Sequence, residues 1–316
     1  MPSTIVILAT GGTIAGSAAD PGDNVGYTAA QRSVAQLVDS VPALAGQAIE
    51  AEQLAQLDSK DMDHATWARL ASRLAALLER PEVAGVVVSH GTDTLEETAW
   101  FLQRVLAPAK PVVLTAAMRP ATALAADGPQ NLLDAVAVAR EPGARGVVAV
   151  LAGRVHGAAE VRKVHSYRPD AFDSGDAGPI AVVEEGRVRR FRGWPDGQAL
   201  GLARIAADPA EWPWVAVLAS HAGARPDELR ALHAAGVAGV VLACTGNGSV
   251  NAALQPALDE LAVAGVPVWR STRCAGGVIV GGPAEPAAAM SPWQARVELL
   301  LALLGERQDV GLNPTT

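Results

Sequence analysis

The chain has 316 residues and a formal net charge of −8, and 50% of its residues are apolar while only 4% are aromatic. This length fits one large domain or two ordinary ones, and the low aromatic content favours helices packed on aliphatic strands. The negative charge argues against nucleic acid as a partner, because phosphate binding needs a basic surface. The two cysteines form no metal or redox motif, and no apolar run predicts a membrane span.

The chain begins with an apolar run that ends in a glycine-rich turn. Residues 5–9 predict a strand, and the segment Ala9–Gly16 carries Thr13 past its end. Three interpretations compete: an ordinary strand-to-helix turn, a phosphate-binding loop, and a catalytic threonine at a strand end. The segment lacks the G-x-G-x-x-G spacing and the lysine of the phosphate motifs, which weakens the second interpretation. No signal-peptide pattern precedes the strand, so we expect a cytoplasmic protein.

Apolar runs and helical patterns alternate through the first 152 residues. Thr28 is placed to cap the first helix, and Thr94-x-x-Glu97 predicts a capping box at the start of the third. Near-continuous Val, Ile and Leu strands separated by helices indicate a parallel sheet that is covered on both faces. The predicted strands span residues 5–9, 83–89, 111–117 and 146–152, and the predicted helices span 28–41, 63–79, 94–107 and 131–140.

The second half of the chain first breaks this rhythm and then resumes it. A β-hairpin is predicted around Glu185-Gly186, and a final helix begins with Ser291 as its cap and Pro292 at its first position. Strands are predicted at 214–220, 239–245 and 267–271, and helices at 226–235 and 251–264. We predict two α/β domains with mainly parallel sheets: a larger N-terminal domain over residues 1–192, a linker over 193–213, and a smaller C-terminal domain over 214–316.

Polar segments lie beyond the ends of the predicted strands, where open parallel sheets bind their ligands. Asp93 and Thr94 either cap a helix or present a carboxylate and a hydroxyl to the crevice. His90 is interpreted as a hydrogen-bonded structural residue rather than a general base. The histidines have no ligand spacing, so no metal site is expected. The polar segments are Thr10–Thr13, Asp58–Met62, Ser89–Thr94 and Cys244–Gly248.

A threonine nucleophile needs a partner that manages its proton, because the hydroxyl pKa is far above neutral. Lys163 is one of only three lysines in the chain, and Asp93 could hold it near a threonine hydroxyl, where it would relay a proton. A solvated lysine is the alternative. Tyr27 is one of only two tyrosines and is either a second proton partner or an anchor for its loop.

The chain resembles a known family over essentially its whole length, and two segments carry most of the resemblance. Ala9–Gly16 and Val88–Ala99, in that order, closely match the two signature motifs of the bacterial-type L-asparaginases, and the chain resembles the asparaginase/glutaminase family. Further similarity lies in Asp58–Met62, Ala117–Pro120, Ala126–Pro129, Gly246–Gly248 and Gln294–Arg296.

The resemblance implies two α/β domains that hydrolyse the side-chain amide of L-asparagine without a cofactor. It implies Thr13 as the nucleophile that forms a β-aspartyl ester, Tyr27 as its proton partner, and a second catalytic group of Thr92, Asp93 and Lys163. The implied substrate contacts are Ser59 with the α-carboxylate, Asp93 with the α-ammonium, and the backbone of Ala117. The family also implies a homotetramer, or dimer of dimers, with Asn247 at the edge of a neighbouring subunit's site.

The chain departs from the family's secreted members after Arg273. An acidic residue of the neighbouring subunit normally faces the substrate ammonium there, and Glu285 is the only carboxylate between Arg273 and Ser291 that can take this role. Three alternatives to an asparaginase remain open: a glutaminase-asparaginase of broader specificity, the amidohydrolase part of an amidotransferase, and a non-catalytic amino-acid-binding protein. A nucleotide-binding enzyme is a distant fourth.

Overall fold

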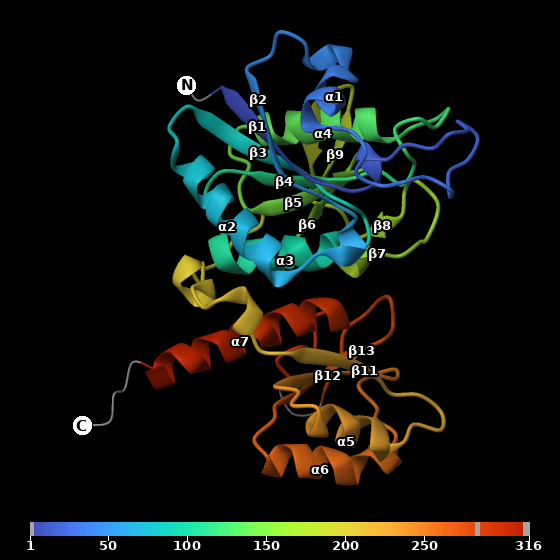
Figure 1. The fold of residues 1–316 in the computed structure, drawn as a ribbon, viewed down its shortest axis with the longest axis vertical. Helices are drawn as coiled ribbons and strands as arrows, with labels where there is room; N and C mark the ends of the chain where they lie inside the picture. The colour runs from blue at the N-terminus through green and yellow to red at the C-terminus, as the bar shows by residue number, and fades with distance from the viewer. Residues whose placement is uncertain (1–2, 282–284, 312–316) are drawn as a thin grey trace. The chain divides into compact units, whose positions relative to one another are not determined.

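The computed structural model describes residues 3–281 and 285–311, with side chains as far as residue 307. The chain divides into two compact units, Met1–Leu202 and Ala203–Thr316. The division falls inside the segment predicted as a linker, which forms two short 3-10 turns, η5 (Leu202–Ile205) and η6 (Pro209–Glu211). Figure 1 shows both units, the first in blue to yellow-green and the second in yellow to red.

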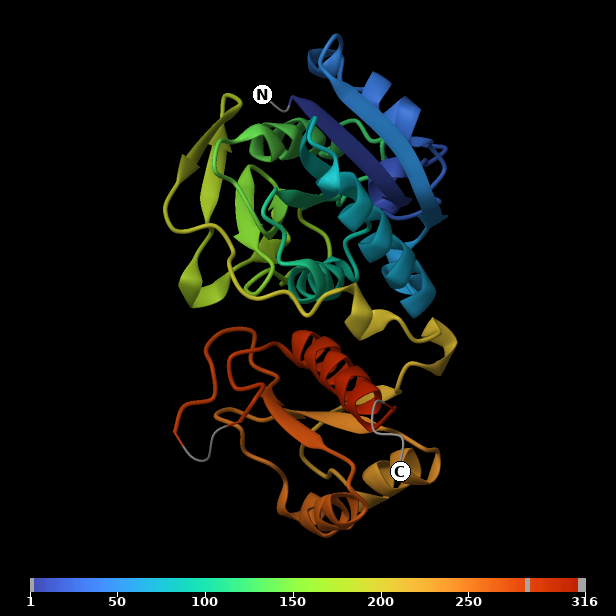
Figure 2. The same ribbon diagram turned by 90° about the vertical axis from the view of Figure 1, so that its left-hand side faces the viewer.

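The first unit is built on an eight-stranded sheet in the order β10-β9-β6-β5-β4-β3-β1-β2. The strands from β2 to β5 pair in parallel, whereas β6, β9 and β10 form an antiparallel edge that includes the predicted hairpin. Figure 2 shows this edge on the side of the sheet opposite to β1 and β2. The prediction of a mainly parallel sheet is confirmed. The strands are β1 (Thr4–Gly11), β2 (Ile49–Leu57), β3 (Val83–Ser89), β4 (Val112–Thr115), β5 (Val147–Leu151), β6 (Arg154–Gly157), β9 (Ala181–Glu184) and β10 (Arg187–Arg190).

Helices cover both faces of this sheet, as its aliphatic strands require. In Figure 1, α1 and α4 lie on one face, and α2 and α3 lie on the other. Ile7 and Val87 of the central strands pack with Leu132 and Ala135 of α4 in one buried cluster. Full burial of each large aliphatic side chain contributes about 1.5–3 kcal/mol, which stabilises the central strands against α4. The helices are α1 (Val34–Asp39), α2 (His64–Glu79), α3 (Leu95–Leu106) and α4 (Gly128–Arg140).

The helix predicted from Thr28 is wrong in its first half. The helix begins only at Val34, where Ser33 and Gln36 form a capping box. The preceding residues belong to a loop, because Thr28 pairs with Ser17 in an isolated bridge and Arg32 donates its N–H to the carbonyl of Ala15. The hydrogen bonds that a helix would have used are therefore made to the segment after β1.

Strand β2 was not predicted, because its sequence lacks the hydrophobic pattern by which strands are recognised. Glu50, Glu52 and Gln53 interrupt its apolar positions, and the strand is the outermost member of the sheet, with no strand on its far side. An edge strand with polar side chains gives neither a continuous apolar run nor a clear alternation.

The second unit has a three-stranded parallel sheet in the order β11-β12-β13. The smaller α/β domain predicted at the C-terminal end is confirmed. The predicted cap of the last helix is also confirmed, because Ser291 Oγ accepts a hydrogen bond from Gln294 N at 3.2 Å. No helix in the described residues is long and apolar enough to span a membrane. The elements are β11 (Val215–Ala219), α5 (Pro226–Ala234), β12 (Gly239–Cys244), α6 (Gln255–Val263), β13 (Val268–Thr272) and α7 (Pro292–Gly311).

Candidate active site

Strand β1 ends at Gly11, and Gly12 follows it; a residue with a side chain at either position would be strained. Gly11 and Gly12 have φ angles of 113° and 84°, a region that residues with a Cβ rarely adopt. A Cβ on Gly12 would lie 2.5 Å from the Cα of Gly91, so the turn after β1 touches the backbone that follows β3. Thr13 comes next and begins a single 3-10 turn, η1 (Thr13–Ala15). The nearly buried Thr13 hydroxyl is thus fixed at the carboxyl end of a central strand.

The Thr13 hydroxyl is hydrogen-bonded to Tyr27, and the two oxygens are 2.7 Å apart. Tyr27 lies in the loop that is closed by the isolated antiparallel bridge between Ser17 and Thr28. A Cβ on Gly16 would come within 2.9 Å of the Tyr27 ring, so this glycine leaves the space that the ring occupies. The distance is within the reach required for proton transfer between two hydroxyl groups.

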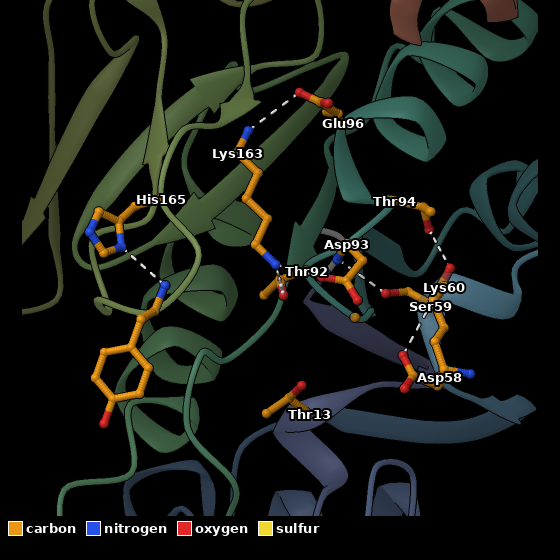
Figure 3. A network of polar contacts seen from close by, with 12 residues as sticks. Thr13, Asp58, Ser59, Lys60, Thr92, Asp93, Thr94, Glu96, Lys163 and His165 are labelled. Atoms are coloured by element: carbon orange, nitrogen blue, oxygen red, sulfur yellow. Dashed lines mark hydrogen bonds and ion pairs between the residues drawn. The ribbon is translucent and has the colours of Figure 1, made fainter. Parts of the chain in front are cut away.

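The end of β3 and the short strand β7 (Arg162–Lys163) bring together three predicted site residues. The Lys163 ammonium donates to Thr92 Oγ1 at 2.9 Å and to Asp93 Oδ1 at 2.5 Å. Figure 3 shows Lys163 reaching down to this pair, with the Thr13 hydroxyl directed to the side on which they lie. The lysine is therefore held by a hydroxyl and a carboxylate rather than free in solvent.

Ser59 joins this group from the turn η3 (Ser59–Asp61) that follows β2. Its buried hydroxyl accepts a hydrogen bond from Asp93 N at 3.1 Å (Figure 3). The capping box predicted for Thr94 and Glu97 is wrong, because Thr94 makes no side-chain cap and instead donates its hydroxyl to the carbonyl of Ser59 at 2.8 Å. A tertiary contact between two loops has replaced the local one.

His90 has the structural role that was predicted for it. It is fully buried, with one ring nitrogen 2.7 Å from the carbonyl of Gly91 and the other 3.0 Å from the Thr98 hydroxyl. Burial lowers the pKa of His90 to about 4, so the ring is neutral near pH 7.

Glu96 is a buried acid beside the site that the sequence analysis did not single out. Its carboxylate accepts a hydrogen bond from the backbone N–H of Lys163 at 3.3 Å (Figure 3). Burial, and then the nearby charge of Glu97, raises the pKa of Glu96 to about 7. In the sequence this residue looks like any acid in the first turn of a helix, and only its burial distinguishes it.

Replacing Glu96 by glutamine should stabilise the protein at alkaline pH. Because the pKa of Glu96 is higher in the folded state, its contribution to stability is present below the unfolded pKa and is lost as the pH rises through about 7. The free energy of unfolding of Glu96→Gln, relative to the wild type, should therefore increase by up to about 3 kcal/mol between pH 5 and pH 8. Urea denaturation at both pH values measures it, with the exposed Glu79→Gln as the matched control. A relative stability that does not change with pH would contradict the prediction.

The three remaining residues that were predicted to bind substrate are divided between the two units. Ala117 follows β4 and packs, fully buried, with Ile14 and Ala15. Asn247 and Glu285 belong to the second unit. The Asn247 amide exchanges two hydrogen bonds of 2.7 Å with the backbone of Val280, and Glu285 Oε1 lies 3.9 Å from Arg270 Nε. The roles expected of these two residues in a neighbouring subunit's site stay predictions.

Two family profiles match the chain. The profile described as "Asparaginase, N-terminal" matches residues 4–195, and the profile described as "Glutaminase/Asparaginase C-terminal domain" matches residues 214–310.

Curated relatives and a solved structure agree with these matches. The glutaminase-asparaginase of Pseudomonas fluorescens biotype A is 35% identical over 95% of this chain and 86% of the relative. L-asparaginase 2 of Bacillus subtilis is 35% identical over 95% of this chain and 82% of the relative. The crystal structure of a probable cytoplasmic L-asparaginase from Campylobacter jejuni superimposes with a TM-score of 0.90 at 34% identity, and the match covers 99% of this chain and 100% of that one.

Proposed function

The chain belongs to the asparaginase/glutaminase family, and from this membership we propose that the protein hydrolyses the side-chain amide of L-asparagine to L-aspartate and ammonia. The observation that carries the proposal is the arrangement at the ends of the neighbouring strands β1 and β3. Two hydroxyl groups lie there, and each has a proton-managing partner: Thr13 with Tyr27, and Thr92 with Lys163. We assign all of these groups to the N-terminal domain predicted over residues 1–192.

The reaction proceeds in two halves through an ester. Thr13 Oγ1 attacks the amide carbon of the substrate, the hydroxyl proton reaches the amide nitrogen, and the C–N bond breaks to release ammonia. Water then adds to the ester carbon and restores the Thr13 hydroxyl as L-aspartate leaves. Tyr27 handles the Thr13 proton, and the Thr92–Lys163 pair, with Asp93 holding the lysine, serves the second proton transfer.

The substrate is held by polar groups around Asp93. Ser59 Oγ accepts the N–H of Asp93, which leaves its own hydroxyl proton for the α-carboxylate of the substrate. The Asp93 carboxylate is half exposed and pairs with the α-ammonium. We propose that the backbone of Ala117 and, from a neighbouring subunit, Asn247 and Glu285 complete the pocket.

A glutaminase-asparaginase is the second candidate. The relatives from Pseudomonas fluorescens and Pseudomonas aeruginosa carry this name at 35% and 36% identity. The two substrates differ by one methylene, which a pocket distinguishes by only about 1–3 kcal/mol.

Ammonia release from L-asparagine and, separately, L-glutamine tests both candidates on the wild-type protein. A kcat/KM for L-asparagine that is at least about 10-fold higher than that for L-glutamine supports the asparaginase. This ratio corresponds to a difference of about 1.4 kcal/mol in activation free energy. Comparable release from both substrates supports the second candidate. A folded protein that releases ammonia from neither would overturn the proposed function.

We further propose that the protein assembles as a homotetramer in the cytoplasm. The family resemblance supports the assembly, and the name of the Campylobacter jejuni structure supports the compartment, whereas the Haemophilus influenzae relative is named as periplasmic. Light scattering should give four times the chain mass of 32.4 kDa, and a monomer would refute the assembly. Fractionation of the source cells would decide between the compartments.

A further inference from the structure

A chain of hydrogen bonds runs from the outer helices to the end of β3. Trp67 Nε1 of α2 is 2.9 Å from the hydroxyl of Thr98 on α3, and this hydroxyl is 3.0 Å from His90 Nε2. His90 Nδ1 is in turn 2.7 Å from the carbonyl oxygen of Gly91. The Trp67 ring is fixed by stacking on Phe101 at a centroid distance of 4.8 Å. The three side chains in the chain of hydrogen bonds are all buried.

The two ends of this chain dictate its direction. The indole N–H of Trp67 can only donate, and the carbonyl of Gly91 can only accept. Thr98 therefore accepts from Trp67 and donates to His90 Nε2, and the single ring proton of neutral His90 lies on Nδ1. The low pKa of His90 keeps this form in place at neutral pH.

This chain of hydrogen bonds ends at Gly91, where the backbone is crowded. A Cβ on Gly91 would lie 2.3 Å from Ser59 Oγ, and the Cα of Gly91 already bounds the turn at Gly12. The Gly91 carbonyl belongs to the peptide unit that also contains the N–H of Thr92. Fixing the carbonyl therefore fixes the orientation of the peptide from which the Thr92 side chain projects to Lys163.

We propose that His90 is a positioning residue: its Nδ1–H, held in place by Thr98 and Trp67, orients the Gly91–Thr92 peptide so that Thr92 Oγ1 meets the Lys163 ammonium. The catalytic part of this inference rests on the proposed function, whereas the hydrogen-bond direction does not. His90 acts through Gly91 and exchanges no proton with the substrate.

The first test is nitrogen NMR of protein labelled with ¹⁵N-histidine. The His90 signals are assigned from their loss in His90→Gln. We expect Nδ1 to be protonated and Nε2 unprotonated from pH 6 to pH 8, and Thr98→Val to shift only the Nε2 resonance, because valine keeps the side-chain shape but cannot donate. Protonation on Nε2, or a His90 ring that titrates near its ordinary pKa, would contradict the proposed direction of the hydrogen bonds.

The second test compares two amides at position 90. In His90→Asn the side-chain NH₂ takes the place of Nδ1–H and can still donate to Gly91, whereas His90→Gln places its amide toward Thr98 and leaves the Gly91 carbonyl unheld. With L-asparagine as the substrate, we expect the kcat of His90→Asn to lie within about 3-fold of the wild type. We expect the kcat of His90→Gln to fall by at least about 10-fold, since small misplacements of reacting groups cost this much. His156, equally buried and bonded to Ser174 at 2.7 Å, supplies the matched controls His156→Asn and His156→Gln, which should not differ in kcat. Equal kcat values in the two His90 variants would overturn the proposal.

A third measurement needs no activity. The chain has three lysines, so protein labelled with ¹³Cε-lysine gives three signals, which Lys60→Arg and Lys110→Arg assign. We expect the Lys163 signal to shift in His90→Gln and to stay in place in His90→Asn, with Lys60 and Lys110 unchanged in both. If the wild type released no ammonia, the proposed function would fail, yet these signals would still decide whether His90 positions Thr92. An unmoved Lys163 signal in His90→Gln would refute the positioning role.

Discussion

Replacing Thr13 by alanine should lower kcat for L-asparagine by at least about 10³-fold, because the variant lacks the atom that forms the ester. The fold should tolerate the change. The substitution removes the side-chain hydrogen bond to Tyr27, and the loss of such a bond typically costs about 1 kcal/mol of stability. Ammonia release and thermal unfolding of the same preparation measure the two effects.

Two further substitutions at position 13 separate chemistry from shape. Thr13→Val keeps both branches of the side chain and removes only the hydroxyl, so it should be as inactive as Thr13→Ala. Thr13→Ser keeps the hydroxyl and should retain measurable turnover. A Thr13→Val variant with near wild-type kcat would show that another group is the nucleophile.

Replacing Lys163 by methionine should lower kcat by roughly 10²–10⁴-fold, the range expected for the loss of a positioned proton-transfer group. Methionine keeps an unbranched apolar side chain but removes the ammonium that bridges Thr92 and Asp93. Asp93 is half exposed, so water can replace the lost partner and the stability should change by less than about 1 kcal/mol. Steady-state kinetics with L-asparagine gives the result.

Lys110→Met is the matched control for this change. Lys110 donates a hydrogen bond to the carbonyl of Arg80 and lies before the start of β4, at the end of the sheet opposite to the site, so its variant should keep wild-type kcat. Lys163→Arg adds a second comparison, because arginine keeps the positive charge but cannot give up its proton near neutral pH. Full activity in Lys163→Arg would show that charge alone, not proton transfer, is required.

The central sheet and the residues at its strand ends were predictable because their sequence signals are local. β1 and β3 are continuous aliphatic runs, and each is followed directly by its polar segment. Since the carboxyl ends of neighbouring parallel strands share one edge of the sheet, the proximity of Thr13 and Thr92 follows from sequence order and fold class.

The parts that were missed depend on contacts between distant segments. Thr94 has the local pattern of a helix cap, yet its hydroxyl donates a hydrogen bond to the carbonyl of Ser59. No sequence pattern predicts this contact, because the two residues are far apart in the chain. Glu96 is a common residue for the first turn of a helix, and its pKa is raised mainly because the surrounding elements bury it, with a further contribution from the charge of Glu97. The roles predicted for Asn247 and Glu285 concern a neighbouring subunit, so the structure of one chain leaves them as predictions.

The contact between Gly12 and Gly91 has a consequence for redesign of the pocket. Because backbone touches backbone there, the spacing between the Thr13 and Thr92 loops is set by the sheet itself and has no side chain that can be trimmed or enlarged. An engineer who wants the protein to accept a longer amide cannot widen this spacing by substitution. Variation in the pocket must come from side chains, such as those of the Tyr27 loop or of the residues around Ser59, because a Cβ on either glycine would overlap neighbouring atoms.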